Sequence, residues 1–179
     1  YSIQSERRGY SLELAVDFVR IQQERKAWWR LDPNEKVLPV ANQKLDDVKA
    51  TWPEGDIRVR IGDYMFRPHQ RWTITAVPEA GGYLGGPYYK IVIEGTQRAL
   101  AATADLELTT VPAFTGAAEQ LWCIQQLTDG TFRIMPKSIP GQSGINKKYV
   151  LYSVGDSTPT LAEYDFSTDN SKWSFRDSY

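Results

Sequence analysis

The chain contains one histidine, His69, and one cysteine, Cys123. A thiol and an imidazole can form a nucleophilic pair when they lie side by side and a third group orients the base. Cys123 lies in the middle of a Trp-x-Ile sequence, and two similar sequences carry Thr73 and Ser174 at this position. The pattern is typical of a small residue on a strand. We therefore expect no catalytic residue and predict that the chain is not an enzyme.

Other residues that could in principle bind a metal ion or a phosphate, or act in catalysis, lack the neighbours that this chemistry requires. A zinc site needs three or four clustered His, Cys or carboxylate ligands, and the sequence has no such cluster. The glycine-rich residues 78–87 lack the Gly-Lys-Ser/Thr ending of a phosphate-binding loop, and they are predicted to form a mobile connection. Asp46 and Asp47 are adjacent in a polar stretch, where carboxylates are usually solvated. We expect neither a metal ion nor an organic cofactor.

Residues 25–30 interleave cations with Trp28 and Trp29. Such a stretch can be a stacking platform for single-stranded nucleic acid, or a strand whose arginine stems cover one tryptophan. The formal net charge of −1 opposes nucleic-acid binding, which needs an excess of basic side chains. We expect no nucleic-acid partner. We also expect no membrane span, because no apolar run approaches the ~20 residues needed to cross a bilayer.

Three tryptophans, about 50 residues apart, organise the rest of the chain. They are Trp72, Trp122 and Trp173, and each is followed two residues later by a large apolar residue (Ile74, Ile124 and Phe175). Residues two apart in a strand face the same side, so each pair is predicted to enter the core while the residue between them faces outward. Near-constant spacing of one pattern indicates an internally repeated fold.

A second pattern keeps the same spacing. Residues 89–91 and 132–134 each follow a repeat tryptophan with an aromatic-x-Ile pattern, and residues 1–3 open the chain in the same way. The opening also aligns with residues 122–126. We therefore predict three units, about 1–71, 72–121 and 122–179, of which the first is enlarged by extra sequence near residues 32–56.

Short alternating segments predict strands throughout the chain. They fall near 11–21, 57–61, 72–77, 88–94, 99–102, 106–110, 121–127, 132–135, 149–154, 160–166 and 172–175. Asp129-Gly130 is a strong hairpin signal between two of them, and residues 138–147 resemble an exposed loop. Short strands separated by turn signals indicate an all-β sandwich or barrel, and the threefold repeat favours the β-trefoil.

Gln-x-Trp occurs at residues 70–72 and 120–122, and the variant Ser-x-Trp at residues 171–173. Because each copy begins a strand, the chain resembles the ricin B-type β-trefoil lectins, and residues 169–175 are especially similar to fungal members. The β-trefoil protease inhibitors of mushrooms are similar in outline. The resemblance implies an all-β fold with a single β-trefoil domain over residues 1–179.

The resemblance implies shallow sugar sites that combine an acidic residue, an aromatic ring and an asparagine three residues before the repeat tryptophan. The asparagine position holds Asn170 in the third unit, His69 in the first and Glu119 in the second. The candidate aromatic rings are Tyr164 or Phe166 in the third unit and Tyr64 or Phe66 in the first. The candidate acids are Asp46 and Asp47 in the first unit and Asp169 beside Asn170. None of the three units is complete.

The function that this resemblance implies is non-enzymatic recognition of galactose-type glycans, with glycans or glycoproteins as partners and a homodimer left open. The first alternative is a protease inhibitor that presents residues 138–147 or 78–87 to its target. A third is an accessory binding domain of an enzyme. A β-trefoil that has lost its sugar sites also stays open.

Two features bear on the compartment. Cys123 has no partner for an intrachain disulfide, and the sequence has no Asn-x-Ser/Thr acceptor for glycosylation. We therefore expect a cytoplasmic or non-classically secreted protein. The chain begins at Tyr1 rather than Met, so a signal peptide that has been removed remains an alternative.

Overall fold

The structure is a computed structural model that describes residues 1–16, 53–83, 85–141, 149–155, 157–165 and 167–177. The chain forms two compact units: one contains Tyr1–Ala15 and Glu54–Tyr179, and the other contains Val16–Pro53. All elements described below belong to the first unit. Asp46, Asp47 and the cation-rich residues 25–30 lie outside the described residues.

The first unit consists of strands and short 3₁₀ helices. In chain order they are β1 (Ser2–Ser5), β2 (Ser11–Leu14), β3 (Ile57–Gly62), η2 (Pro68–Gln70), β4 (Trp72–Tyr83), β5 (Gly86–Ile93), β6 (Ala99–Ala102), β7 (Leu108–Val111), η3 (Ala118–Gln120), β8 (Trp122–Gln126), β9 (Phe132–Pro136), β10 (Tyr149–Ser153), β11 (Pro159–Glu163), η4 (Asp169–Ser171) and β12 (Trp173–Arg176). Within the described residues, no helix has the length and apolar character to cross a membrane.

Every fourth strand begins with a repeat tryptophan, and a 3₁₀ turn precedes it each time. All three tryptophan side chains are fully buried. Each indole Nε1 donates to a leucine carbonyl oxygen: Trp72 to Leu12 at 3.0 Å, Trp122 to Leu100 at 3.0 Å, and Trp173 to Leu151 at 2.9 Å. The same anchor therefore recurs three times, which confirms the predicted threefold repeat.

Six strands close into a ring. The antiparallel pairs β12–β1, β4–β5 and β8–β9 are joined by the register pairs Tyr89 with Trp122 and Phe132 with Trp173. The last gap is closed at Tyr1, whose ammonium donates to the Trp72 carbonyl at 2.7 Å and whose carbonyl accepts from the Trp72 N–H at 2.8 Å. Closing a sheet on itself removes its exposed edges.

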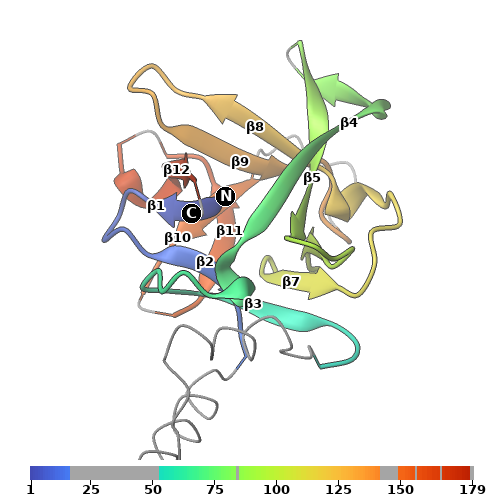
Figure 1. The fold of residues 1–179 in the computed structure, drawn as a ribbon. Coiled ribbons are helices and arrows are strands. Elements are labelled where there is room, and N and C mark those ends of the chain that lie inside the picture. The colour runs from blue at the N-terminus through green and yellow to red at the C-terminus, as the bar shows by residue number, and fades with distance from the viewer. Residues whose placement is uncertain (17–52, 84, 142–148, 156, 166, 178–179) are drawn as a thin grey trace, which may run out of the picture. The chain divides into compact units, whose positions relative to one another are not determined.

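The hairpin pairs β2–β3, β6–β7 and β10–β11 complete three four-strand repeats. A six-strand barrel with three such hairpins is the β-trefoil fold. One repeat spans both termini, because β12 supplies its tryptophan strand and β1 to β3 supply the rest; Figure 1 shows the N-terminal and C-terminal strands side by side.

Ile3, Ile91 and Ile134 occupy equivalent positions on β1, β5 and β9, and all three are fully buried. This confirms the aromatic-x-Ile pattern that links the chain's opening to residues 89–91 and 132–134. The alternative alignment of the opening with residues 122–126 is wrong. β1 pairs with β12, and the tryptophan strand of this repeat is β12 itself, beginning at Trp173.

The predicted facing of the Trp-x-Ile segments holds only for the tryptophans. Ile74, Ile124 and Phe175 are each partly buried, and in the second copy the residue between, Cys123, is the buried one. The thiol side of β8 is covered because Cys123 packs with Met135, Val150 and Tyr152 in a second hydrophobic cluster. Burial on both sides of a strand removes the simple alternation that a strand exposed to water on one side shows.

The glycine-rich residues 78–87 are not the connection that the sequence predicted. β4 runs on to Tyr83 and β5 begins at Gly86, so these residues form the end of a long hairpin (Figure 1). The register shifts between Val77 and Gly82. A Cβ atom at Gly82 would lie 2.3 Å from the carbonyl oxygen of Gly86, so here glycine permits a close cross-strand approach.

The extra sequence of the first repeat lies between β2 and β3. β2 ends at Leu14 and β3 begins at Ile57, whereas the equivalent β6 ends at Ala102 and β7 begins at Leu108. The second compact unit, Val16–Pro53, occupies this connection.

Candidate functional site

His69 and Cys123 lie in different surroundings. His69 is fully buried, and its Nε2 lies 3.3 Å from the Glu13 Oε2. Cys123 packs in the cluster with Met135 and Tyr152, where burial raises the pKa of its thiol. The two side chains therefore do not form a nucleophilic pair. Full burial also corrects the assignment of His69 to a sugar site, because its ring does not reach the surface.

His69 belongs to a buried polar network around Glu13. The Glu13 carboxylate accepts from Arg60 Nε at 2.6 Å and from Gln70 Nε2 at 3.0 Å, in addition to its contact with His69. Burial by itself raises the pKa of Glu13. The hydrogen bonds from His69, Arg60 and Gln70 outweigh this effect, so the net pKa lies below its usual value. The network is an internal brace for the first repeat.

Gln70 extends this brace to the loop that follows β3. Its Oε1 accepts from the Met65 N–H at 2.7 Å, and its Nε2 donates to the Asp63 carbonyl at 2.7 Å. Arg71 Nη2 donates to the Phe66 carbonyl at 2.6 Å. Three side-chain hydrogen bonds thus fix the backbone of this loop.

The fixed loop presents two aromatic rings. Tyr64 and Phe66 have ring centroids 4.6 Å apart at an interplanar angle of 53°. Phe66 is 60% exposed and Met65 is 47% exposed. Phe66 also has φ of 58°, a left-handed conformation that is costly for a bulky residue. We call Tyr64, Met65 and Phe66 the aromatic loop.

The third repeat places its candidate residues in separate contacts. Asn170 is half-buried on η4, and the exposed Asp169 has its Oδ1 3.5 Å from Lys172 Nζ. The ring of Tyr164 instead lies under the Arg133 guanidinium, 4.8 Å from its centroid. The contacts of the described residues therefore do not join Tyr164 to Asn170 or Asp169. Phe166 lies outside the described residues.

Tyr152 explains why Ser171 can replace the glutamine of the other repeats. The Tyr152 hydroxyl donates to the Glu163 carbonyl at 2.7 Å and accepts from the Asp165 N–H at 2.7 Å. In the first repeat, Gln70 bonds the Asp63 carbonyl and the Met65 N–H, which likewise belong to residues two apart in the chain. The phenol from β10 therefore fills the place of the missing amide.

The predicted β8–β9 hairpin is confirmed. Thr131 donates to Asp129 Oδ1 through its hydroxyl at 2.6 Å and its N–H at 2.9 Å, while Gly130 has φ of 89°. These bonds from Thr131, together with the Lys172 ammonium 3.0 Å from Oδ2, lower the pKa of Asp129 to about 2. Lys172 immediately precedes β12, so this ion pair connects the hairpin turn to the start of that strand.

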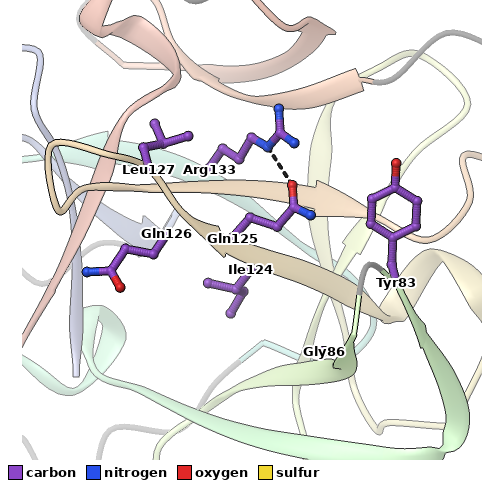
Figure 2. A pocket seen from close by; sticks show the side chains of 7 residues that line it. All are labelled: Tyr83, Gly86, Ile124, Gln125, Gln126, Leu127 and Arg133. Atoms are coloured by element: carbon purple, nitrogen blue, oxygen red, sulfur yellow. Dashed lines mark hydrogen bonds between the residues drawn. The ribbon is translucent and has the colours of Figure 1, made fainter.

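A pocket of about 410 Å³ opens beside this hairpin. Its lining residues are Tyr83, Gly86, Ile124, Gln125, Gln126, Leu127 and Arg133. Figure 2 shows Gln125 and Arg133 on one side of the strand pair, where Arg133 Nε donates to Gln125 Oε1 at 2.6 Å, with Ile124 and Gln126 directed to the other side.

The sequence contained a signal for this pair. The Asp-Gly turn fixes the register that places Gln125 opposite Arg133. Tyr83 had no such signal, because it lies in the hairpin that was expected to be a mobile connection.

The structure describes the two loops considered for protease inhibition only in part. Residues 78–87 are part of the β4–β5 hairpin. In residues 138–147, Ile139 is buried with 8% exposure, and residues 142–147 lie outside the described part. A substrate-like loop must offer its side chains to the protease, and Ile139 is directed inward.

Comparison with known proteins identifies the fold. No protein-family model matches the chain, and no curated protein matches it either. A mosquitocidal holotoxin matches with a TM-score of 0.60 and 14% identity, over 97% of this chain and 16% of the toxin. The designed threefold-symmetric protein ThreeFoil matches with a TM-score of 0.58 and 18% identity, over 97% of this chain and 94% of that protein.

A β-trefoil lectin of the Vibrio vulnificus hemolysin/cytolysin, solved with N-acetyl-D-lactosamine bound, has a TM-score of 0.55 and 15% identity, over 97% of this chain and 90% of the lectin. At these identities the similarity establishes the fold, a β-trefoil shared with lectins and toxins. The chain spans 16% of the holotoxin's length, so it corresponds to one part of that larger protein.

Proposed function

We propose that this chain is a non-enzymatic carbohydrate-binding protein that recognises galactose-type glycans through a shallow surface site. The observation that carries the proposal is the aromatic loop of the first repeat. Phe66 and Tyr64 are held as a pair on a loop that Gln70 and Arg71 fix from below. A pyranose offers one apolar face to such a ring, while its hydroxyls bond nearby polar side chains.

The strained backbone and the exposed ring of Phe66 both reduce the stability of the folded protein, and this supports a role of the loop in binding. A bulky residue at positive φ is strained, and the exposed part of the Phe66 ring gains nothing from the hydrophobic effect until a ligand covers it. The buried network of Glu13, His69 and Gln70 supplies the rigidity. A rigid platform binds with less loss of conformational freedom than a mobile one.

Two similar structures support the choice of galactose-type ligands. The Vibrio vulnificus β-trefoil lectin was solved with N-acetyl-D-lactosamine bound. A Clostridium perfringens endo-β-galactosidase, described as releasing GlcNAcα1-4Gal, has a TM-score of 0.54 and 12% identity, over 97% of this chain and 31% of the enzyme.

A second site in the third repeat is part of the proposal. Asn170 can donate two hydrogen bonds and accept others, so it can hold vicinal sugar hydroxyls, and the exposed Asp169 beside it can accept one more. The first-repeat site is the principal one, because the exposed Phe66 and the half-buried Tyr64 lie together there.

A glycan array with purified wild-type protein, Phe66→Ala and Asn170→Ala tests the proposal. We expect the wild type to bind galactose-terminated glycans and Phe66→Ala to bind them about 10- to 150-fold more weakly, the equivalent of roughly 1.5–3 kcal/mol of lost apolar burial. Tyr1→Ala is the matched control, because Tyr1 is an exposed aromatic residue outside both candidate sites.

The outcomes are distinct for each site. Loss of binding in Asn170→Ala alone would move the principal site to the third repeat. Absence of binding to any glycan by the wild type would contradict the proposed function.

A further inference from the structure

The pocket beside Gln125 exists because one hairpin is longer than its counterparts. β4 reaches from Trp72 to Tyr83, whereas the equivalent β8 ends at Gln126 and β12 at Arg176, four and three residues after their tryptophans. β5 and β8 pair at Tyr89 with Trp122. The barrel does not require the extension, which adds Tyr83 and Gly86 as one wall of the pocket.

Several contacts hold the extended hairpin in place. Lys137 Nζ donates to the Ala80 carbonyl at 3.0 Å and lies 5.0 Å from the ring centroid of Tyr88. Tyr83, Tyr88 and Tyr164 all pack against the buried cluster that contains Cys123. The wall that carries Tyr83 is therefore fixed before any ligand arrives.

Arg133 on the opposite wall is equally constrained. Its Nε donates to Gln125 Oε1 at 2.6 Å, and the face of its guanidinium lies over the Tyr164 ring. These contacts use the Nε and one face of the guanidinium, so the edge formed by the two Nη atoms stays available to a ligand. Such an edge offers two parallel donors, the geometry that a carboxylate accepts.

The lining residues define the charge and size of the ligand. Among them, Arg133 is the one cation and none is a carboxylate. The amide of Gln125, on the same side of the strand pair as Arg133, and the Tyr83 ring add the donors, acceptors and aromatic surface that suit a sugar ring. A volume of about 410 Å³ lies within the range of small-molecule sites.

We propose that this pocket is a second carbohydrate subsite, which takes a sugar residue bearing a carboxylate and binds that carboxylate with Arg133. The inference rests on the proposed carbohydrate-binding function, and it assigns an acidic sugar to a place distinct from the aromatic loop. Tyr83 packs against the ring of the sugar. Gln125 is a positioning residue, because it orients the Arg133 guanidinium.

Calorimetric titration of the full chain with matched pairs of glycosides tests this inference. The pairs are methyl glucuronide and methyl glucoside, methyl galacturonide and methyl galactoside, and the methyl glycoside of N-acetylneuraminic acid and its methyl ester. We expect at least one acidic member to bind about tenfold or more tightly than its neutral partner, and the three pairs separate uronic acids from sialic acid.

Three variants connect this preference to the pocket. Arg133→Gln is expected to remove the preference, and Gln125→Glu to remove it as well, because the new carboxylate takes the place of the ligand's. Arg133→Lys keeps the positive charge but loses the two parallel N–H donors of the guanidinium. We therefore expect its preference for acidic over neutral glycosides to be several-fold smaller than that of the wild type. Arg176→Gln is the matched control, since it removes one exposed cation from β12.

Thermal unfolding of each variant checks that the fold is retained, and Arg133→Lys serves if Arg133→Gln is unstable. Equal binding of every acidic and neutral pair by the wild type overturns the inference. A preference that survives Arg133→Gln but not Arg176→Gln overturns it too. Phe66→Ala separates the two proposals: it should weaken neutral galactosides and leave the acidic preference intact, whereas loss of both would show one shared site.

Discussion

In each repeat, the residue after the leucine that accepts the indole hydrogen bond determines which side chain fits in the 3₁₀ turn before the tryptophan. Glu13, Ala101 and Tyr152 each follow the leucine whose carbonyl receives an indole N–H. In the second repeat the small Ala101 accompanies the larger Gln120, and in the third the large Tyr152 accompanies the small Ser171. A larger residue at one position therefore goes with a smaller one at the other, as dense packing requires.

Tyr152 and Ser171 are expected to be energetically coupled. Tyr152→Phe should cost about 1–3 kcal/mol, because the Glu163 carbonyl and the Asp165 N–H lose their buried partner. Tyr152→Ala should cost about 3–5 kcal/mol, and adding Ser171→Gln should recover part of that loss by recreating the pair of the second repeat. Urea denaturation of the single and double variants measures the coupling. Strict additivity would contradict the compensation.

Glu13 is expected to make stability depend on pH. Its pKa in the folded protein lies below the usual value of 4.5, so its contribution is complete above that pH and is lost as the pH falls through the folded pKa. Glu13→Gln should cost about 1–3 kcal/mol at neutral pH, and the difference from the wild type should shrink below about pH 4.5. Urea midpoints between pH 7 and pH 3 measure this. A constant difference would contradict the assigned role.

Several residue-scale features could be predicted from the sequence, and others could not. The Asp129-Gly130 turn was predictable, because its chemistry is local. The burial of His69 was not, since it depends on Glu13, which is 56 residues away in the chain. The resemblance to ricin B-type lectins implied a surface residue at this position, whereas His69 is buried and contacts the Glu13 carboxylate on a distant strand.

Among the elements, the β4–β5 hairpin departs most from the sequence-based prediction. Its glycines were taken as signs of a mobile connection, because glycine density alone does not distinguish a loop from closely approaching strands. The pairing of Gly82 with Pro87 and of Tyr83 with Gly86 shows the second case. By contrast, the strands that begin at the three tryptophans were predictable, because the pattern of a tryptophan followed two residues later by an apolar residue recurs at near-constant spacing.

Two alanine substitutions test the close approach within this hairpin. Gly82→Ala places a Cβ 2.3 Å from the Gly86 carbonyl oxygen, so the strands must separate, at a cost of roughly 1–3 kcal/mol. Gly86→Ala is the matched control, since the nearest atom to its added Cβ, the Tyr83 carbonyl oxygen, is 3.8 Å away. Thermal unfolding of both variants compares them. Equal stability of the two would contradict the observed hairpin geometry.

At the scale of the whole molecule, the threefold repeat distributes the core evenly. Trp72, Trp122 and Trp173 are each fully buried and bonded in the same way. Replacing any one by alanine should cost about 3–5 kcal/mol, because each leaves a similar cavity. Chemical denaturation of the three variants measures this. A variant with wild-type stability would contradict the equivalence of the three repeats.

The repeat could be predicted from sequence at this scale, whereas the location of a binding surface could not. Tryptophan spacing gives the number of units, but the exposure of Phe66 and the pocket at Arg133 both arise where the repeats differ. The first repeat has a carboxylate brace beneath its loop, and the second has an extended hairpin. Departures from symmetry of this kind are where we place function.

Nuclear magnetic resonance titration of the full chain with N-acetyl-D-lactosamine tests the proposed function most directly, because it locates the ligand without assuming a site. We predict that backbone amide shifts concentrate on residues 63–71, around Tyr64 and Phe66, and that Phe66→Ala removes them. Shifts centred on another part of the protein would contradict the assignment of the aromatic loop. No shifts with this or any other glycan would contradict carbohydrate binding itself.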